Sequence, residues 1–192
     1  PTNYVHIDNL GRVWVTISTR LIPRILGCKP NFKDGFIMLI DEEKPRIVAE
    51  NLGFTNECLI HPVTGDLYVN ETFSRCLSKF NVSSKGHLLN KTTVMEFGTG
   101  EFPDGFAFDI EGGVWVTCVV SNKVIRISSN GQKEIIINAR LNATDEILLI
   151  VIVCSKSAKR KSVFTFLIQY KRYAKIGMVN NTKTSKRCNC CV

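Results

Sequence analysis

The sequence has 192 residues, of which 44% are hydrophobic, and a formal net charge of +8 at pH 7. Residues 1–150 hold 15 Lys and Arg against 17 Asp and Glu, whereas residues 151–192 hold 10 Lys and Arg and no acid. The main body therefore gives no reason to propose nucleic-acid binding. The longest apolar run, residues 147–154, is too short to cross a membrane as a helix.

The first residues, PTNYVHID, show neither the charged start nor the apolar stretch of a secretory signal. Because no such signal is visible, we expect a cytoplasmic protein. The residues also resemble the interior of a domain, so we expect the sequence to start within a fold, which leaves a preceding signal open. Asn-x-Ser/Thr sequons are expected to occur by chance in a chain this rich in Asn, Ser and Thr. They begin at five positions: Asn70, Asn81, Asn90, Asn142 and Asn180.

One short pattern recurs along the chain and predicts the fold. His6–Thr16 and Phe108–Cys118 share D-x-x-G-x-V-W-V-T, and Ile60–Asn70 is a looser copy. Their turn glycines are spaced by 54 and 47 residues, which suits a four-stranded propeller blade. These glycines are Gly11, Gly65 and Gly112.

Alternating apolar and polar residues around short polar turns predict two β-hairpins in each period. The first hairpin lies within residues 4–17, and the others are expected at residues 35–50, 76–89 and 123–138. Two hairpins make one four-stranded sheet. Helical periodicity is nearly absent before residue 138, so the sequence predicts an all-β protein.

A polar residue opens the first strand of each copy, eight residues before Gly11 and Gly112 and nine before Gly65. These residues are Asn3, Asn56 and Asp104. In a propeller the innermost strands begin at one mouth of the central channel, where the three side chains would converge. Buried oxygens of this kind are stable when they hold a cation or a hydrogen-bond network. Ca²⁺, Mg²⁺ or Mn²⁺ would suit them best, with Zn²⁺ also possible. Alternatively, each side chain satisfies turn backbone locally.

Three stretches resemble one known family: NYVHIDNLGRVWVTIST, FTNECLIHPVTGDLYVNETFSRCLSKFNV and FPDGFAFDIEGGVWVTCVVSNKVIRI. They are similar to the SMP-30/gluconolactonase/LRE family of regucalcin-like lactonases, which are six-bladed β-propellers. The resemblance covers about residues 3–137, roughly three blades. It implies a propeller fragment over residues 1–138, followed by a divergent basic tail over residues 139–192.

The resemblance also implies a site. Members hold one divalent cation through a Glu, an Asn and an Asp. The Asn falls on Asn56, and the Asp, also the general base, falls on Asp104. A substrate-contacting Asn falls on Asn3. Two features depart from the family: Glu57 stands where a Gly is usual, and the metal-binding Glu of the first blade has no counterpart in this sequence.

The implied function is hydrolysis of a sugar lactone or similar cyclic ester, assisted by Ca²⁺, Zn²⁺, Mn²⁺ or Mg²⁺. The expected partner is a small-molecule lactone, and a further segment or another chain is expected to complete the propeller. The alternatives are a non-catalytic binding or calcium-handling propeller, since fold does not determine function, and an inactive fragment.

The tail differs in composition from the body. Within it, FTFLIQY predicts a strand, and DEILLIVIV predicts a strand or a short helix. Its dense positive charge fits either a basic anchor on an anionic surface or a segment without a selected function.

Overall fold

The structure is a computed structural model that describes residues 1–42, 44–138, 149–155, 163–169 and 174–180, the last three ranges through their backbone alone. The chain divides into two compact units, Pro1–Asp104 and Gly105–Val192. The described residues contain no α-helix and one 3₁₀ turn, η1 (Arg24–Gly27), so the all-β prediction is confirmed. None of their helical segments has the length and apolarity needed to span a bilayer.

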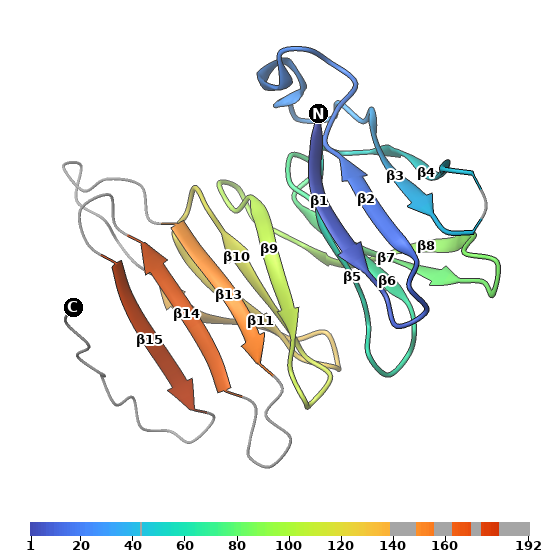
Figure 1. Cartoon of the computed structure of the whole chain (residues 1–192). Helices are drawn as coiled ribbons and strands as arrows, with labels where there is room; N and C mark the ends of the chain where they lie inside the picture. Colours follow the sequence, from blue (N-terminus) through green and yellow to red (C-terminus); the bar gives the residue numbers. More distant parts are fainter. Residues whose placement is uncertain (43, 139–148, 156–162, 170–173, 181–192) are drawn as a thin grey trace. The chain divides into compact units, whose positions relative to one another are not determined.

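The first unit consists of two four-stranded antiparallel sheets with strands in sequence order (Figure 1). The strands of the first sheet are β1 (Thr2–Ile7), β2 (Val13–Ile17), β3 (Gly35–Ile40) and β4 (Arg46–Leu52). Those of the second sheet are β5 (Thr55–Ile60), β6 (Leu67–Glu71), β7 (Cys76–Val82) and β8 (Leu88–Glu96).

The third four-stranded sheet begins at the end of the first unit and continues in the second. Its strands are β9 (Pro103–Phe108), β10 (Val114–Cys118), β11 (Lys123–Ile127) and β12 (Lys133–Asn138). All four predicted hairpins are therefore confirmed.

The second unit also contains a three-stranded antiparallel sheet within the sequence that we expected to be a divergent tail. Its strands are β13 (Leu149–Ser155), β14 (Val163–Gln169) and β15 (Ala174–Asn180). The strand predicted for FTFLIQY is present as β14. For DEILLIVIV, a strand or a short helix was predicted, and the structure has a strand, β13, from residue 149 onward. Residues 145–148 and 181–192 lie outside the described residues.

The two sheets of the first unit share one hydrophobic core. Trp14, Ile37 and Leu39 of the first sheet and Leu67 and Val69 of the second are all 0% exposed. Burying side chains of this size stabilises the fold by roughly 1.5–3 kcal/mol each. Trp14, which recurs in the repeat, therefore packs in the core.

The aspartate of the repeat organises each hairpin. Asp8 accepts hydrogen bonds from the backbone N–H groups of Leu10 and Arg12 (2.9 and 3.0 Å). Its other oxygen accepts from Arg12 Nε at 2.7 Å and from Trp14 Nε1 at 2.9 Å. The turn also needs a left-handed residue, which Gly11 supplies with φ of +76°. One carboxylate thus fixes the turn and anchors the buried tryptophan.

Asp109 repeats this arrangement in the third sheet. It accepts from the backbone N–H of Gly113 at 2.7 Å, from Trp115 Nε1 at 3.0 Å and from Arg126 Nε at 2.8 Å. The arginine here comes from β11 rather than from the turn, yet it donates to the repeat aspartate as Arg12 does. The repeated D-x-x-G-x-V-W pattern is therefore a hydrogen-bonding unit as well as a turn signal.

In the second sheet His61 replaces this aspartate. Its Nδ1 accepts from the backbone N–H groups of Val63 and Thr64 at 3.2 and 3.1 Å. Burial lowers the pKa of His61 below its usual value of 6.5, with a smaller opposing contribution from Asp66. A protonated Nδ1 cannot accept these bonds, so the turn requires the neutral imidazole.

We expect the unfolding free energy to fall as the pH drops below about 6.5. Because the pKa of His61 is lowered in the folded protein, the unfolded chain binds a proton more readily than the folded one. The stabilising contribution of neutral His61 is therefore complete above pH 6.5 and is lost as the pH falls toward the folded-state pKa. In His61→Asp the carboxylate can accept the same backbone bonds without titrating in this range. Thermal unfolding at pH 8, 7, 6 and 5 should show a smaller acid loss for the variant, and equal losses would contradict this role of His61.

Candidate functional site

The three predicted site residues occupy the same structural position. Each is the second residue of the first strand of its sheet: Asn3 in β1, Asn56 in β5 and Asp104 in β9. The equivalence inferred from spacing to the turn glycines is therefore present in the structure. All three residues are partly buried.

The last residue of the repeat supports the strand at this point. In the first sheet the hydroxyl of Thr16 accepts from the backbone N–H of Tyr4 at 3.0 Å, and in the third sheet Thr117 accepts from Gly105 at 3.1 Å. Both contacts lie directly after the polar residue that opens the strand. The threonine thus helps to set the backbone that carries this residue.

Asn70 occupies the equivalent position in the second sheet, at the end of the loosest copy of the repeat. It is 0% exposed, and its Nδ2 donates to the backbone oxygen of Asp104 at 2.9 Å. Our sequence analysis missed this residue. The available signal was the exchange of Thr for Asn at the last repeat position, which is Thr in the other two copies.

Asn56 and Asp104 form the centre of the site. Asn56 Nδ2 donates to Asp104 Oδ1 and also to Thr72 Oγ1, the latter at 3.1 Å. The Thr72 hydroxyl in turn donates to the backbone oxygen of Pro103 at 2.7 Å. Side chains from β5 and from the residue that follows β6 therefore hold both the Asp104 carboxylate and the Pro103 backbone.

Asn3 does not join this pair by a hydrogen bond. Its Nδ2 donates to Ser18 Oγ at 3.0 Å and to the backbone oxygen of Thr55 at 3.1 Å. These bonds tie the start of β1 to the start of β5. The structure therefore brings together two of the three predicted residues. The Asn3 amide instead bridges the first two sheets, which is neither the predicted cluster nor the local turn contact of the alternative interpretation.

The electrostatics of Asp104 differ from those of the structural aspartates. Burial raises the pKa of its carboxyl group, and the hydrogen bond from Asn56 and the positive charge of Arg24 offset part of this rise. By contrast, the hydrogen bonds of Asp8 and Asp109 outweigh burial and lower the pKa of those groups. A partly buried carboxyl group whose pKa is raised is a candidate for proton transfer.

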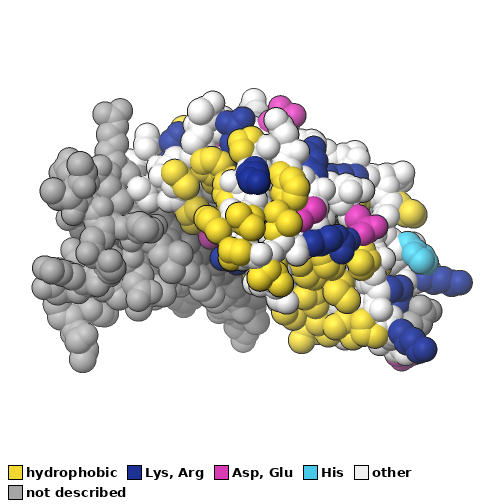
Figure 2. Space-filling model, turned by 90° about the horizontal axis from the view of Figure 1, so that it is seen from above, with side chains coloured by type: hydrophobic (Ala, Val, Ile, Leu, Met, Phe, Trp, Pro, Cys, Tyr) yellow, Lys and Arg dark blue, Asp and Glu magenta, His cyan; other side chains and the backbone are white. Residues whose placement is uncertain are grey.

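Arg24 lies in the loop between β2 and β3, which is at the upper end of the first unit in Figure 1. Its guanidinium carbon is 5.9 Å from the centre of the Phe54 ring. The same loop exposes Ile22 and Ile25, with exposed fractions of 86% and 70%. Seen from above, apolar side chains surround basic ones on the described part of this face (Figure 2). The surface around the β2–β3 loop therefore combines apolar side chains with positive charge.

Glu57 stands where the family resembled by the sequence usually has a glycine, and its side chain contacts Tyr4. It forms a side-chain hydrogen bond with Tyr4, and burial together with the charge of Glu57 raises the pKa of that phenol. The larger residue is thus accommodated by a side-chain hydrogen bond between β5 and β1, next to the site. It leaves the Asn56 contacts described above intact.

The oxygens at this site fit the preferences of a hard cation. Asn70 Oδ1 is buried and has no hydrogen-bond partner, and Asp104 is a carboxylate held by one neutral side-chain donor. Carboxylate and amide oxygens are typical Ca²⁺, Mg²⁺ and Mn²⁺ ligands. However, the described residues contain no group of three His, Cys, Asp or Glu side chains placed to hold a metal. The protein ligands supplied here would therefore be few.

Comparison with known proteins agrees with this architecture. The family model described as SMP-30/Gluconolactonase/LRE-like region matches residues 2–145. The chain belongs to the SMP-30/gluconolactonase/LRE-like family. This match confirms the resemblance and extends a few residues beyond the limit that we expected from sequence.

A curated relative, a 6-deoxy-6-sulfogluconolactonase from Pseudomonas putida, is 26% identical over 129 residues. The alignment covers 66% of this chain and 42% of the relative, so the chain spans less than half of that protein's length.

Several solved structures share the fold. A luciferin-regenerating enzyme superposes with a TM-score of 0.66 and 17% identity, over 86% of this chain and 53% of the other. A gluconolactonase from Xanthomonas campestris gives a TM-score of 0.62 at 19% identity, over 88% of this chain and 54% of the other. A calcium-binding regucalcin from Agrobacterium tumefaciens gives a TM-score of 0.56 at 18% identity, over 69% of this chain and 43% of the other. The fold is thus of the propeller type.

Proposed function

We propose that this family member takes part in the hydrolysis of a sugar lactone or similar cyclic ester, with Asp104 as the general base. The observation that carries the proposal is the Asp104 carboxyl group, whose pKa is raised by burial and which is fixed by Asn56 at the start of an inner strand. The names of the family and of the curated sulfogluconolactonase relative support the same reaction class.

The chemistry follows from the properties of this carboxylate. Asp104 would accept a proton from water as the water oxygen adds to the lactone carbonyl carbon. The ring C–O bond then breaks, and the leaving alkoxide takes up a proton to give the open hydroxy acid. Asn70 and Thr72 hold the backbone on either side of the peptide bond between Pro103 and Asp104. This support limits the movement of the base relative to the substrate.

Asn56, Asn70 and Asp104 are the residues that would hold a divalent cation. In the structure the amide nitrogen of Asn56 faces Asp104. To bind a cation, Asn56 would present its amide oxygen instead, which requires a 180° rotation of the amide group. When bound, such an ion would polarise the lactone carbonyl and lower the pKa of water. Asn3, on edge strand β1, would contact the substrate. It forms a hydrogen bond to Thr55, the residue before Asn56, and so lies next to the site.

The direct test is hydrolysis of D-glucono-1,5-lactone by the 192-residue chain, followed by acid release at constant pH. The protein would be treated with EDTA and then supplied with Ca²⁺, Mn²⁺, Zn²⁺ or Mg²⁺. Metal-restored hydrolysis above the spontaneous rate supports the proposal. If the ions raise the thermal unfolding midpoint but no lactone opens, the chain is a cation-binding propeller module and the catalytic proposal is wrong.

Replacing Arg24 by Gln should shift the acid limb of the pH–rate profile to higher pH. The positive charge of Arg24 lowers the pKa of Asp104, so its loss raises that pKa further. A general base must be ionised, and a larger fraction of Asp104 would then be protonated at a given acidic pH. Arg20→Gln is the matched control, because Arg20 lies in the same loop but pairs with Glu50. An unchanged limb in Arg24→Gln would contradict the coupling.

A further inference from the structure

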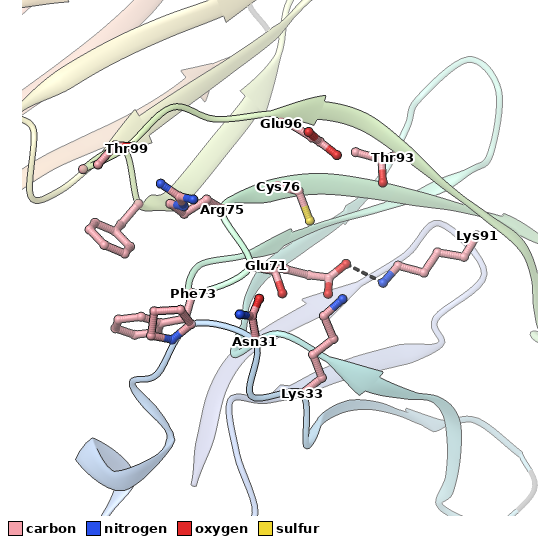
Figure 3. A pocket seen from close by; sticks show the side chains of 14 residues that line it. Asn31, Lys33, Glu71, Phe73, Arg75, Cys76, Lys91, Thr93, Glu96 and Thr99 are labelled. Atoms are coloured by element: carbon pink, nitrogen blue, oxygen red, sulfur yellow. Dashed lines mark ion pairs between the residues drawn. The ribbon is translucent and has the colours of Figure 1, made fainter.

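A separate cavity lies within the first unit, between the β2–β3 loop, the β6–β7 connection and the ends of β7 and β8 (Figure 3). Its volume is about 540 Å³, which falls in the range of small-molecule binding sites. Neither Asn56 nor Asp104 lines it. The cavity is therefore a separate site from the Asn56–Asp104 pair.

The floor of the cavity is a buried carboxylate. Glu71 is 0% exposed and accepts hydrogen bonds from the backbone N–H of Gly53 at 2.8 Å and from Ser78 Oγ at 2.6 Å. Lys91 Nζ lies 2.6 Å from Glu71 Oε1. Burial alone would raise the pKa of Glu71, but these donors hold it below its usual value. Glu71 is thus ionised, and its charge is matched by Lys91.

A second ammonium group remains after this pairing. Lys33, from the β2–β3 loop, points toward Glu71 in Figure 3. Neither Lys33 nor Arg75, the other cation of the lining, makes an ion pair with any residue that the structure describes. Glu96 is the one further acidic residue of the lining, and it is exposed. The cavity therefore carries one positive charge in excess, and Lys33 is free to bind an anion.

The other end of the cavity is apolar. Phe73 and Phe102 line it with ring centres 5.4 Å apart, in a tilted arrangement, and Pro30 adds further apolar surface. Aromatic rings favour contact with other flat or apolar groups. The cavity thus places the Lys33 ammonium at one end and an aromatic surface, on the same side as Arg75, at the other (Figure 3).

We propose that this cavity binds a small organic anion. Its carboxylate or phosphate group pairs with Lys33, and its apolar or aromatic body packs against Phe73 and Phe102. Glu71 contributes by fixing Lys91, so that the anion meets a positively charged wall rather than a buried negative charge. This ligand class matches both ends of the cavity, whereas a neutral sugar lactone would leave the Lys33 charge unused.

The proposal is tested by calorimetric titration of the full chain with phenyl phosphate and phenylacetate, and with benzyl alcohol and inorganic phosphate as probes of each half. We expect saturable one-to-one binding of at least one aromatic anion, weakened by added NaCl. Lys33→Gln should lower the affinity about tenfold or more, because it removes a charged hydrogen-bond donor. Lys29→Gln, in the same loop but outside the lining, should leave the affinity unchanged.

Phe102→Leu provides a second variant, which should weaken the aromatic anions while leaving the response to salt in place. Thermal unfolding of each variant shows that it is folded before titration. The proposal is overturned if neither aromatic anion binds, if Lys33→Gln binds as tightly as the unchanged chain, or if inorganic phosphate or benzyl alcohol binds as tightly as the aromatic anions.

Discussion

Asp104→Asn is expected to lower lactone hydrolysis by roughly 10²- to 10⁴-fold, the usual contribution of a positioned general base. The substitution keeps the shape of the side chain and the backbone contact to Asn70, but it removes the group that accepts the proton. The measurement is the initial rate of D-glucono-1,5-lactone opening with metal present, compared with the unchanged chain under the same conditions.

Two further variants define what this loss means. Glu50→Gln neutralises an exposed carboxylate and should keep full activity. Asn70→Thr restores the residue found in the other two copies of the repeat and removes the donor to the Asp104 backbone. We expect it to lower activity less than Asp104→Asn does. Retention of normal hydrolysis by Asp104→Asn would exclude this residue as the base.

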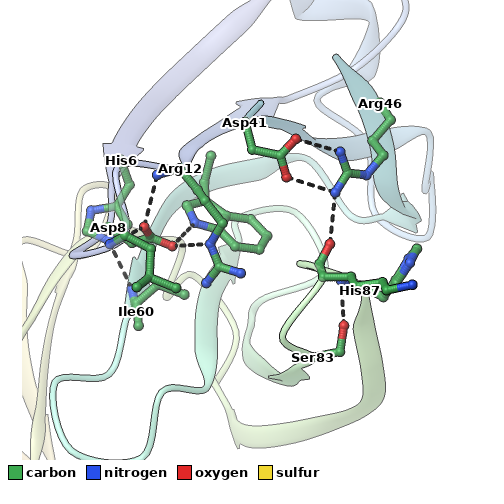
Figure 4. Close-up of polar contacts among 11 residues, drawn as sticks. His6, Asp8, Arg12, Asp41, Arg46, Ile60, Ser83 and His87 are labelled. Atoms are coloured by element: carbon green, nitrogen blue, oxygen red, sulfur yellow. Dashed lines mark hydrogen bonds and ion pairs between the residues drawn. The ribbon is translucent and has the colours of Figure 1, made fainter. Parts of the chain in front are cut away.

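Asp8→Ala should lower the unfolding free energy by about 3–5 kcal/mol, as expected when one partner of a buried ion pair is removed. The Asp8 side chain is 3% exposed and receives the bonds of Arg12 and Trp14 (Figure 4). Its loss would leave a largely buried guanidinium and a buried indole N–H without their acceptor. Chemical denaturation monitored by tryptophan fluorescence provides the measurement.

The equivalent substitution in the third sheet, Asp109→Ala, should be similarly destabilising because its contacts are the same. Glu42→Ala, in an exposed turn, is the control and should change stability by no more than about 0.5 kcal/mol. If Asp8→Ala and Asp109→Ala were as mild as Glu42→Ala, the repeat aspartate would be a turn residue alone.

The sequence was informative where the information was local and repeated. Alternation and turn glycines predicted the hairpins, and the spacing to those glycines placed Asn3, Asn56 and Asp104 at one register. Such features depend on a few neighbouring residues and on strand geometry. Two or three copies of the same pattern also average out accidental matches.

The sequence was less informative about contacts between distant segments. The role of Asn70 depends on a hydrogen bond to a backbone oxygen 34 residues away, and that of Arg24 on a loop that carries no motif. The repeat aspartates are visible in the sequence, but their bonds to Trp14 and Trp115 require the folded hairpin. The hydrogen-bond partners of Asn3 could not be predicted because polar side chains at a strand start have several nearby acceptors.

The burial of Asn70 has a consequence for covalent modification. Asn70, Glu71 and Thr72 form an Asn-x-Thr acceptor sequence, yet all three are buried, and the Asn70 nitrogen that would carry a glycan donates to Asp104. A sugar attached at Asn70 and an assembled Asn56–Asp104 pair therefore exclude each other. Glycan occupancy at this residue would mark chains that were modified before folding, whereas the exposed Asn81 and Asn90 could carry sugars on the folded protein.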